Sequence, residues 1–377
     1  MTNIGIECES IEGSESWGVG RIVKNLLQEI SRRSELASEF RFFLYFKSGI
    51  PDLEFLNNPI FVKKNIGPSS FSLYYYVFLP VKLWFEGLDL MFFPNYMLPL
   101  IFRGRSLVML TEDIHYEIAA GTLPLRYKLA YKIFAGWWAA CHATKIMAIS
   151  ETSKKEVARL FKINPDRITA NPLGVDPPQK IPDTRPEARS TSYILYIGQA
   201  FPRRHLRETL LAFELLSPQF PDLKLIAVGK DKYNPPVIEK LKNDINTRLG
   251  RNAIIHKEYV SEKELGELYA GARVAIYVSS KEAFGLPPLE ALGYGVPAVV
   301  ADQPVTREIF GSHAFFARPE LVEGLETYTP KSIAAAMAEG LTDETKRQEI
   351  KNAREGILAK YTWQKHADRF LQIITRP

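Results

Sequence analysis

Two glutamates, Glu282 and Glu290, lie eight positions apart and enclose the sequence Ala-Phe-Gly-Leu-Pro-Pro-Leu. Proline is favoured in the first turn of a helix, where its missing N–H is not needed. We therefore place Glu282 on a loop and Glu290 on the helix that follows, with Gly293 and Gly295 ending that helix. Backbone N–H groups at a helix start attract anions, and carboxylates accept hydrogen bonds from hydroxyl groups. Together these properties predict a nucleotide-sugar ligand.

A pair of arginines, Arg203 and Arg204, is a second feature that could bind an anion. The pair follows a strand expected at 193–198 and stands at the turn into the next helix. Guanidinium groups bind phosphate oxygens in a bidentate way, so this position suits a diphosphate. On the local sequence alone, a solvated surface pair is the favoured alternative.

A glycine-bearing loop with Gly18 and Gly20 joins a first strand at 3–8 to a helix. The helix is predicted because apolar residues recur at three- and four-residue intervals from Val19 to Ile30. A strand, a Gly-x-Gly turn and a helix predict an anion site at the helix start. The third glycine of the dinucleotide fingerprint is absent, so a simple tight turn is an equal alternative.

The composition indicates a globular protein. A chain of 377 residues, 46% hydrophobic and 24% charged, is long enough for two domains. Lys and Arg (48) exceed Asp and Glu (43) by five, which fits an anionic substrate or membrane surface but is too weak to indicate a nucleic-acid partner. Two cysteines, Cys8 and Cys141, make neither a disulfide framework nor a zinc site and fit a reducing cytoplasm. The sequence has no signal core and no run of about 18 apolar residues, which predicts a soluble or peripheral protein in the cytoplasm.

Strands alternate with helices along most of the chain, which predicts an α/β fold with parallel βαβ units. We expect two Rossmann-like domains facing each other across a cleft, where ligands bind at the carboxyl ends of the strands. Helices are expected at 71–86 and 124–143, and Ser153-x-x-Glu156 is read as a capping box opening another helix. The expected division is a domain at 1–176, a proline-rich linker at 177–192, a domain at 193–360, and a C-terminal helix at 361–377 that packs back on the first domain.

These motifs resemble the retaining glycosyltransferases of the GT-B fold, specifically glycosyltransferase family four. The resemblance rests on Gly-x-Gly-Arg near the N-terminus, Pro-Arg-Arg after a Tyr-Ile-Gly strand, and Glu-x7-Glu around Phe-Gly-Leu-Pro-Pro. It implies that the first domain binds the acceptor and the second binds a UDP- or GDP-sugar. The donor is a substrate, and no cofactor or metal is implied.

The resemblance also implies a role for each motif. Glu282 is expected to face the donor sugar, and Arg203 and Arg204 to neutralise the diphosphate, as catalytic residues. The other donor-binding positions implied are Gly18, Gly20, Tyr259, Val260, Phe284, Gly285, Leu286 and Glu290. Glu308 is expected to be mainly structural. The implied mechanism is front-side attack, in which the leaving diphosphate takes the acceptor's proton.

The acceptor side departs from the family pattern. Where the family often carries His-Asp-Leu, this chain has Thr-Glu-Asp-Ile-His, so Glu112, Asp113 and His115 are the candidate acceptor residues. His115 as a plain loop residue is an equal alternative.

Aromatic and basic residues gather in 71–86 and 124–143. In the second stretch, a helix lying at a lipid interface could be formed by Arg126, Tyr127, Lys128, Tyr131, Lys132, Trp137 and Trp138. A helix packed within the first domain is the favoured alternative.

The resulting hypothesis is a cytoplasmic hexosyltransferase that moves a mannose- or glucose-type sugar to a glycan or lipid-linked acceptor, with peripheral contact to the inner face of the membrane. Two alternatives stay open: a nucleotide-sugar epimerase of the same fold, and a non-catalytic nucleotide-sugar-binding subunit. An epimerase would convert its donor without an acceptor, and a subunit would bind the donor without turnover.

Overall fold

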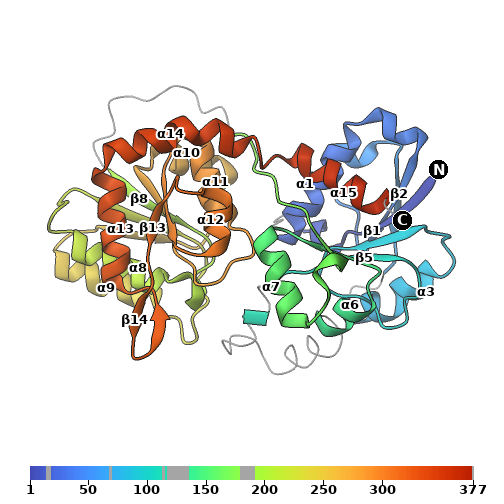
Figure 1. Cartoon of the computed structure of the whole chain (residues 1–377), viewed down its shortest axis with the longest axis horizontal. Coiled ribbons are helices and arrows are strands. Elements are labelled where there is room, and N and C mark those ends of the chain that lie inside the picture. The colour runs from blue at the N-terminus through green and yellow to red at the C-terminus, as the bar shows by residue number, and fades with distance from the viewer. Residues whose placement is uncertain (14–17, 68–69, 113–114, 117–135, 179–191, 376–377) are drawn as a thin grey trace. The chain divides into compact units, whose positions relative to one another are not determined.

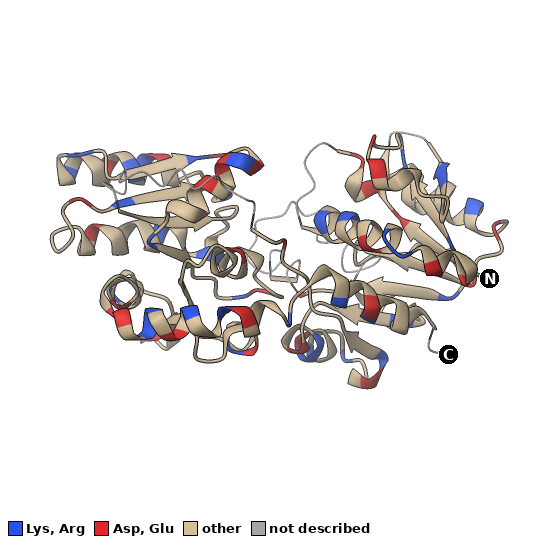
Figure 2. Cartoon of the chain, turned by 90° about the horizontal axis from the view of Figure 1, so that it is seen from above, with Lys and Arg blue, Asp and Glu red and all other residues tan. Residues whose placement is uncertain are grey.

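A computed structural model describes residues 1–13, 18–67, 70–112, 115–116, 136–178 and 192–375. The chain divides into two compact units, one of Met1–Gly174 with Tyr361–Pro377 and one of Val175–Lys360. Each unit contains a parallel sheet with helices on its faces (Figure 1). Charged residues of both signs are interspersed over the helices (Figure 2).

The first unit has a seven-stranded sheet of order β3-β2-β1-β4-β5-β6-β7, all parallel. Its strands are β1 (Thr2–Glu7), β2 (Phe40–Phe46), β3 (Phe61–Asn65), β4 (Leu90–Phe93), β5 (Ser106–Met109), β6 (Lys145–Ala148) and β7 (Ile168–Ala170). Its α-helices are α1 (Val19–Ser31), α2 (Phe71–Leu73), α3 (Leu79–Leu83), α6 (Gly136–His142), α7 (Glu151–Phe161) and α15 (Trp363–Thr375). A π-helical turn, Tyr74–Phe78, joins α2 to α3.

The second unit has a six-stranded parallel sheet of order β10-β9-β8-β11-β12-β13. Its strands are β8 (Tyr193–Ile197), β9 (Lys224–Val228), β10 (Ile254–Lys257), β11 (Val274–Tyr277), β12 (Ala298–Ala301) and β13 (Phe315–Ala317). The helices are α8 (Leu206–Leu216), α9 (Ile238–Leu249), α10 (Glu262–Gly271), α11 (Leu286–Gly293), α12 (Pro304–Phe310), α13 (Pro330–Thr342) and α14 (Glu344–Leu358). A hairpin of β14 (Glu320–Val322) and β15 (Leu325–Thr327) stands apart from the sheet.

Helix α15 belongs to the first unit although the whole second unit precedes it in sequence. It lies beside α1 (Figure 1), and the Phe370 ring packs edge-on against Phe92 of β4 at 5.0 Å between centroids. Arg33 pairs with Asp368 at 2.6 Å at the end of α1. The apolar residues of α15 recur every three or four positions, which explains why this helix is buried along one face.

One local expectation was wrong and one was confirmed. The capping box at Ser153 is displaced, because Ser150 is the N-cap of α7 and its Oγ accepts a hydrogen bond from the Ser153 N–H. Ser153 therefore lies inside the helix. The expected end of helix α11 is confirmed: Gly293 is its last residue, and Gly295, directly after the C-cap Tyr294, takes the left-handed conformation at φ +77°.

Two other expectations fall largely outside the described residues. The linker at 177–192 is described only at its ends, and 124–143 only from Gly136. Within that remainder, Trp137 of α6 is 52% exposed, whereas Trp138 packs against the first unit's core and stacks on His142.

Candidate functional site

The predicted catalytic residues, Arg203, Arg204 and Glu282, lie at the carboxyl ends of two neighbouring strands of the second unit. Strands β8 and β11 are paired in parallel, so the segments that follow them start from the same edge of the sheet. Arg203 and Arg204 lie in a short 3-10 turn after β8, and Glu282 lies in the loop after β11. Open α/β sheets bind ligands at this edge.

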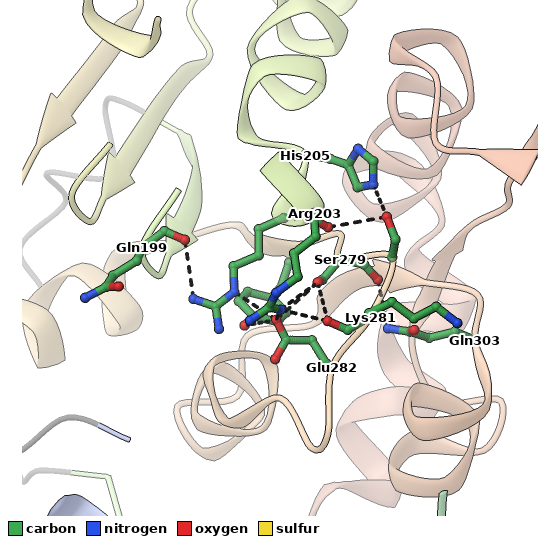
Figure 3. A network of polar contacts seen from close by, with 10 residues as sticks. Gln199, Arg203, His205, Ser279, Lys281, Glu282 and Gln303 are labelled. Atoms are coloured by element: carbon green, nitrogen blue, oxygen red, sulfur yellow. Dashed lines mark hydrogen bonds and ion pairs between the residues drawn. The ribbon is translucent and has the colours of Figure 1, made fainter. Parts of the chain in front are cut away.

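One oxygen of Glu282 receives hydrogen bonds from four side chains (Figure 3). Arg203 Nη1 lies 2.5 Å and Arg204 Nε 2.8 Å from Glu282 Oε1. The Tyr277 hydroxyl donates to the same atom at 2.9 Å and Ser279 Oγ at 3.1 Å. Among the described residues, no donor bonds to Oε2. The sequence motifs are therefore brought together, but in a contact that the sequence did not predict.

The electrostatics of this cluster favour its ionised form. Burial alone would raise the pKa of Glu282, but the charges of Arg204 and Arg203 outweigh burial and lower it to about 2. Burial likewise opposes the charge on Arg204, yet the neighbouring Glu282 carboxylate raises the pKa of Arg204 well above its usual value. The cluster thus carries two guanidinium cations against one carboxylate.

A second layer of contacts holds the arginine turn in place. The backbone N–H of Ser280 donates to the Arg203 carbonyl at 2.8 Å, and Gln303 Nε2 donates to the Ser279 carbonyl at 2.8 Å. The Phe201 ring lies 5.5 Å from the guanidinium carbon of Arg203 and 5.6 Å from that of Arg204. His205 has a left-handed backbone at φ +46° and contacts the Ser280 hydroxyl.

The start of helix α11 follows directly. Gly285 is the N-cap at φ +94°, a conformation that L side chains rarely adopt, so glycine is required for this turn. Of the first four helical residues, only Leu286 and Leu289 carry an N–H, because the other two are prolines. The Phe284 side chain is buried, so only its backbone could meet a ligand.

Glu290 lies on α11, away from the arginine contacts. Its side chain is 9% exposed, and Oε2 accepts a hydrogen bond from the Tyr269 hydroxyl at 2.7 Å. The Tyr269 ring stacks on Tyr294 at 5.5 Å. At the turn after β10, Tyr259 is 55% exposed and Val260 is buried.

The remaining predicted residues belong to the first unit. Gly18 is the N-cap of α1 at φ +56°, and Gly20 is buried within the helix. Glu112 is 3% exposed after β5 and accepts a hydrogen bond from Ser153 Oγ at 2.5 Å. His115 is half-buried with its ring edge-on to Tyr116, and Asp113 lies outside the described residues.

Glu7 is a buried carboxyl that the sequence reasoning missed. It ends β1, and its oxygens accept hydrogen bonds from the Glu9 N–H at 2.8 Å, Asn95 Nδ2 at 2.8 Å and the Tyr74 hydroxyl at 3.2 Å. Burial, with the nearby Glu9 charge, raises the pKa of Glu7 to about 7. The available signal was a lone acidic residue at the carboxyl end of an apolar first strand, which is where ligand-site residues are found.

Within the described ranges, His, Cys, Asp and Glu side chains form no group of three or more that could hold a metal ion. In the same part of the chain, every helix is too short or too polar to cross a bilayer.

Residues 179–356 match the family described as glycosyl transferases group 1. This match supports membership of that family. The matched range covers nearly all of the second unit, including the arginine pair and both glutamates.

The chain is also similar to curated proteins that are named mannosyltransferases. It is 32% identical over 235 residues to the O-antigen chain mannosyltransferase B of Escherichia coli, covering 59% of this chain and 58% of that one. It is 30% identical over 228 residues to the serotype-specific mannosyltransferase WbdA of Escherichia coli, covering 54% of this chain and 26% of that one. The chain thus spans less than two thirds of the length of either relative.

A solved structure shows the fold. The crystal structure of WaaG, a glycosyltransferase involved in lipopolysaccharide biosynthesis, aligns with 99% of this chain and 100% of that chain at a TM-score of 0.72 and 16% identity. The prediction of two parallel α/β domains of the GT-B type is therefore confirmed.

Proposed function

We propose that this protein is a retaining glycosyltransferase of family four that transfers a hexose from a UDP- or GDP-sugar to a glycan or lipid-linked acceptor in polysaccharide or glycolipid synthesis. The observation that carries the proposal is the contact of Arg203 and Arg204 with one oxygen of Glu282 at the carboxyl edge of the second sheet. Among hexoses, mannose is favoured, because the curated relatives described above are named mannosyltransferases.

The two arginines are suited to bind the donor diphosphate. Arg204 uses Nε and Nη1 in hydrogen bonds within the protein, and among the described residues its Nη2 has no hydrogen-bond partner. Because hydrogen bonds hold Nε and Nη1, the Nη2 group points in a fixed direction. A guanidinium N–H fixed in this way is suited to donate to a phosphate oxygen. Cationic donors fixed before the reaction stabilise charge that develops on the leaving diphosphate, usually the largest catalytic contribution.

Glu282 has two tasks in this proposal. Its Oε1 positions the arginines, and its Oε2 accepts a hydrogen bond from a hydroxyl of the donor sugar. Glu290, held by Tyr269, accepts from the ribose, and Tyr259 with Val260 borders the base. The acceptor attacks from the face that the diphosphate leaves, and the diphosphate takes the acceptor's proton. Neither glutamate is assigned as a nucleophile.

Binding of a nucleotide diphosphate tests the donor half of the proposal. A thermal-shift screen of UDP, GDP, ADP and their sugars should show stabilisation by at least one uridine or guanosine nucleotide. Arg204→Ala should lose that stabilisation. The matched control, Arg248→Ala, removes an exposed arginine paired with Glu214 and should keep it. Stabilisation by none of the nucleotides would refute the proposal.

Transfer to an acceptor tests the reaction. With GDP-mannose and UDP-glucose as donors, release of the nucleotide should require an acceptor extract and should persist in EDTA, because the arginines supply the cationic charge. Conversion of the donor sugar without an acceptor would establish the epimerase instead. Donor binding without turnover under any condition would establish the non-catalytic subunit.

A further inference from the structure

His205 stands where the arginine turn ends and helix α8 begins. It is the C-cap of the 3-10 turn Pro202–Arg204 and the N-cap of α8, with a left-handed backbone. Glycine adopts this conformation most readily, and asparagine tolerates it as well as histidine does. The backbone alone therefore does not select histidine at this position, and the contacts of its ring have to account for it.

Three side chains from different segments hold the His205 ring. Its Nε2 contacts the Ser280 hydroxyl in the loop after β11 (Figure 3). Its Nδ1 lies 3.5 Å from Glu208 Oε2 in the first turn of α8, and the side chain as a whole is 12% exposed. The Tyr328 ring, just before α13, lies 5.4 Å from the imidazole between centroids. The ring is therefore fixed in one orientation.

Glu208 sets which imidazole nitrogen faces Ser280 as an acceptor. Burial would raise the pKa of Glu208, but its contact with His205 and the charge of Arg207 outweigh burial and lower it. An ionised carboxylate beside Nδ1 favours the proton on that nitrogen, so Nε2 can accept from the Ser280 hydroxyl. The same hydroxyl lies 3.4 Å from the Arg203 carbonyl, so this chain of contacts ends on the arginine turn.

Ser280 connects the two loops that carry the candidate site. Its backbone N–H donates to the Arg203 carbonyl at 2.8 Å. On one side of it in sequence, Ser279 Oγ donates to Glu282 Oε1 at 3.1 Å. On the other side, the Lys281 carbonyl accepts from Arg203 Nη1 at 2.7 Å. Any movement of Ser280 therefore shifts the arginine turn relative to Glu282.

The topology of the sheet makes such a connection necessary. The strand order β10-β9-β8-β11-β12-β13 reverses between β8 and β11, so the chain leaves these two strands in opposite directions across the sheet. Ligands bind at this kind of reversal, outside the carboxyl ends of the strands. Contacts that cross it, such as the one between His205 and Ser280, keep the loops on its two sides at a fixed separation.

We propose that His205 is a positioning residue for the donor diphosphate: oriented by Glu208, its ring holds the Ser280 loop against the arginine turn and so fixes both guanidinium groups. The inference rests on the proposed function, because His205 is assigned no contact with the ligand itself. Cations that are fixed before a ligand arrives lose less conformational freedom when they bind it. Without the ring contact, the affinity for a nucleoside diphosphate should therefore fall.

Two substitutions separate the ring contact from the backbone conformation. Glutamine carries its amide at about the same distance along the side chain as the imidazole Nε2, so His205→Gln keeps a polar partner for Ser280. Asparagine is one carbon shorter, so His205→Asn keeps a residue that tolerates the left-handed backbone but loses the contact. Affinity and backbone tolerance should thus favour opposite variants.

Calorimetry on the whole chain measures the dissociation constants for UDP and GDP. For whichever of the two binds wild type more tightly, the dissociation constant should rise about fivefold in His205→Asn and stay within about twofold in His205→Gln. The melting temperature of His205→Asn should be no lower than that of His205→Gln. A histidine that only stabilised the fold would not make affinity and melting temperature diverge in this way.

A double-mutant cycle tests whether His205 acts through Ser280. Ser280→Ala should raise the same dissociation constant about fivefold, and the double variant with His205→Asn should lose no more than either single variant. His313→Asn is the matched control, since His313 is half-buried, contacts the Phe310 carbonyl at 3.3 Å, and precedes β13 at the opposite edge of the sheet. It should keep wild-type affinity.

The outcomes distinguish this inference from the proposed function. If wild type binds UDP or GDP but His205→Asn binds as tightly, or if the losses in the double variant add, the role of His205 is overturned and the donor site stands. Losses in His205→Asn and His205→Gln that simply follow their melting temperatures would overturn it as well. If wild type binds neither nucleotide, the proposed function is wrong and this inference falls with it.

Discussion

Arg203 Nη1 and Arg204 Nε lie 2.5 and 2.8 Å from the same atom, Glu282 Oε1, so one carboxylate oxygen orients two guanidinium groups. All three side chains are largely buried, with exposed fractions of 12%, 17% and 8%. This arrangement fixes the cations before any ligand arrives, which is the condition for efficient electrostatic catalysis. It also assigns Glu282 a positioning task that its place in the Glu-x7-Glu motif does not indicate.

Glu282→Gln should reduce transfer by about 100-fold while the protein stays folded at neutral pH. The amide keeps the shape of the side chain but loses the negative charge that holds both arginines. Initial rates at saturating donor, with circular dichroism as the folding check, measure the effect. Glu214→Gln is the matched control, since it neutralises the partner of the exposed Arg248, and it should keep full activity. Full activity of a folded Glu282→Gln variant would show that the Glu282 carboxylate is not needed for transfer.

Arg204→Ala should lower transfer by about 1,000-fold, whereas Arg204→Lys should lower it by about tenfold. Lysine keeps the positive charge but cannot bond Glu282 and the Gln199 carbonyl as the guanidinium does. Comparing kcat/KM for the two variants separates charge from geometry. An equal loss of kcat/KM in Arg204→Ala and Arg204→Lys would mean that the hydrogen bonds of the guanidinium matter more than its charge.

Glu7→Gln should remove a pH dependence from the stability of the first unit. The pKa of Glu7 is about 7 in the folded protein and near its ordinary value of 4.5 when unfolded. The folded state therefore holds a proton that the unfolded state has lost, and stability falls as the pH rises from 4.5 to 7. The free energy of unfolding falls by about 3 kcal/mol over this range, and it does not fall further above pH 7 on account of Glu7.

Glutamine resembles the protonated carboxyl, and the Asn95 amide can turn to present its oxygen to it. Urea midpoints of wild type and Glu7→Gln should therefore agree near pH 4.5, and the variant should be more stable at pH 8. If the urea midpoints of wild type and Glu7→Gln change in parallel from pH 4.5 to 8, Glu7 is already ionised at neutral pH in the folded protein and the prediction is wrong.

His366 should contribute the opposite pH dependence. Burial lowers the pKa of this imidazole from 6.5 to about 4, although its contacts with the Pro172 and Asn171 backbone oppose the shift. As the pH falls below 6.5, the imidazole takes up a proton in the unfolded state first. The free energy of unfolding therefore falls by about 3 kcal/mol between pH 6.5 and pH 4. His366→Gln should flatten this part of the urea-midpoint curve. An unchanged slope between pH 6.5 and 4 would contradict the burial argument.

Gly174→Ala should destabilise the first unit by about 3 kcal/mol. A Cβ there would lie 2.2 Å from the Trp363 backbone nitrogen and 2.6 Å from its Cα, and backbone atoms at a helix start cannot rotate away. Gly356→Ala is the control: it lies inside α14 with open space around it and should gain about 1 kcal/mol from helix propensity. Melting temperatures of the two variants should move in opposite directions.

Much of the architecture could be predicted because the strands are apolar and separated by amphipathic helices. The strands beginning at Thr2 and Tyr193 occur close to their predicted positions, 3–8 and 193–198. Strand β3 was missed because three of its five residues, Phe-Val-Lys-Lys-Asn, are polar, as suits an edge strand. The β14–β15 hairpin was missed because its exposed Leu321 and Leu325 do not follow a buried pattern.

The contacts within the candidate site could not be predicted from the sequence. The resemblance to a family proposed Arg203, Arg204 and Glu282 as ligand-binding residues, but their separation along the chain hides the fact that both arginines donate hydrogen bonds to Glu282. The cap at Ser150 was missed because Ser153 gives an equally good pattern; in the structure Ser150 caps the helix and Ser153 Oγ donates to Glu112. Tertiary contacts of this kind have no local signature.

The assembly of the first unit from 1–174 and 361–377 sets an order for folding during synthesis. A growing chain that has not reached α15 lacks the Phe370 ring that covers Phe92, so the first sheet is left with an uncovered apolar face. The second unit is continuous and can close its core before α15 exists. The part of the protein translated first is therefore expected to finish folding last, and chaperones or stalled translation should affect it most.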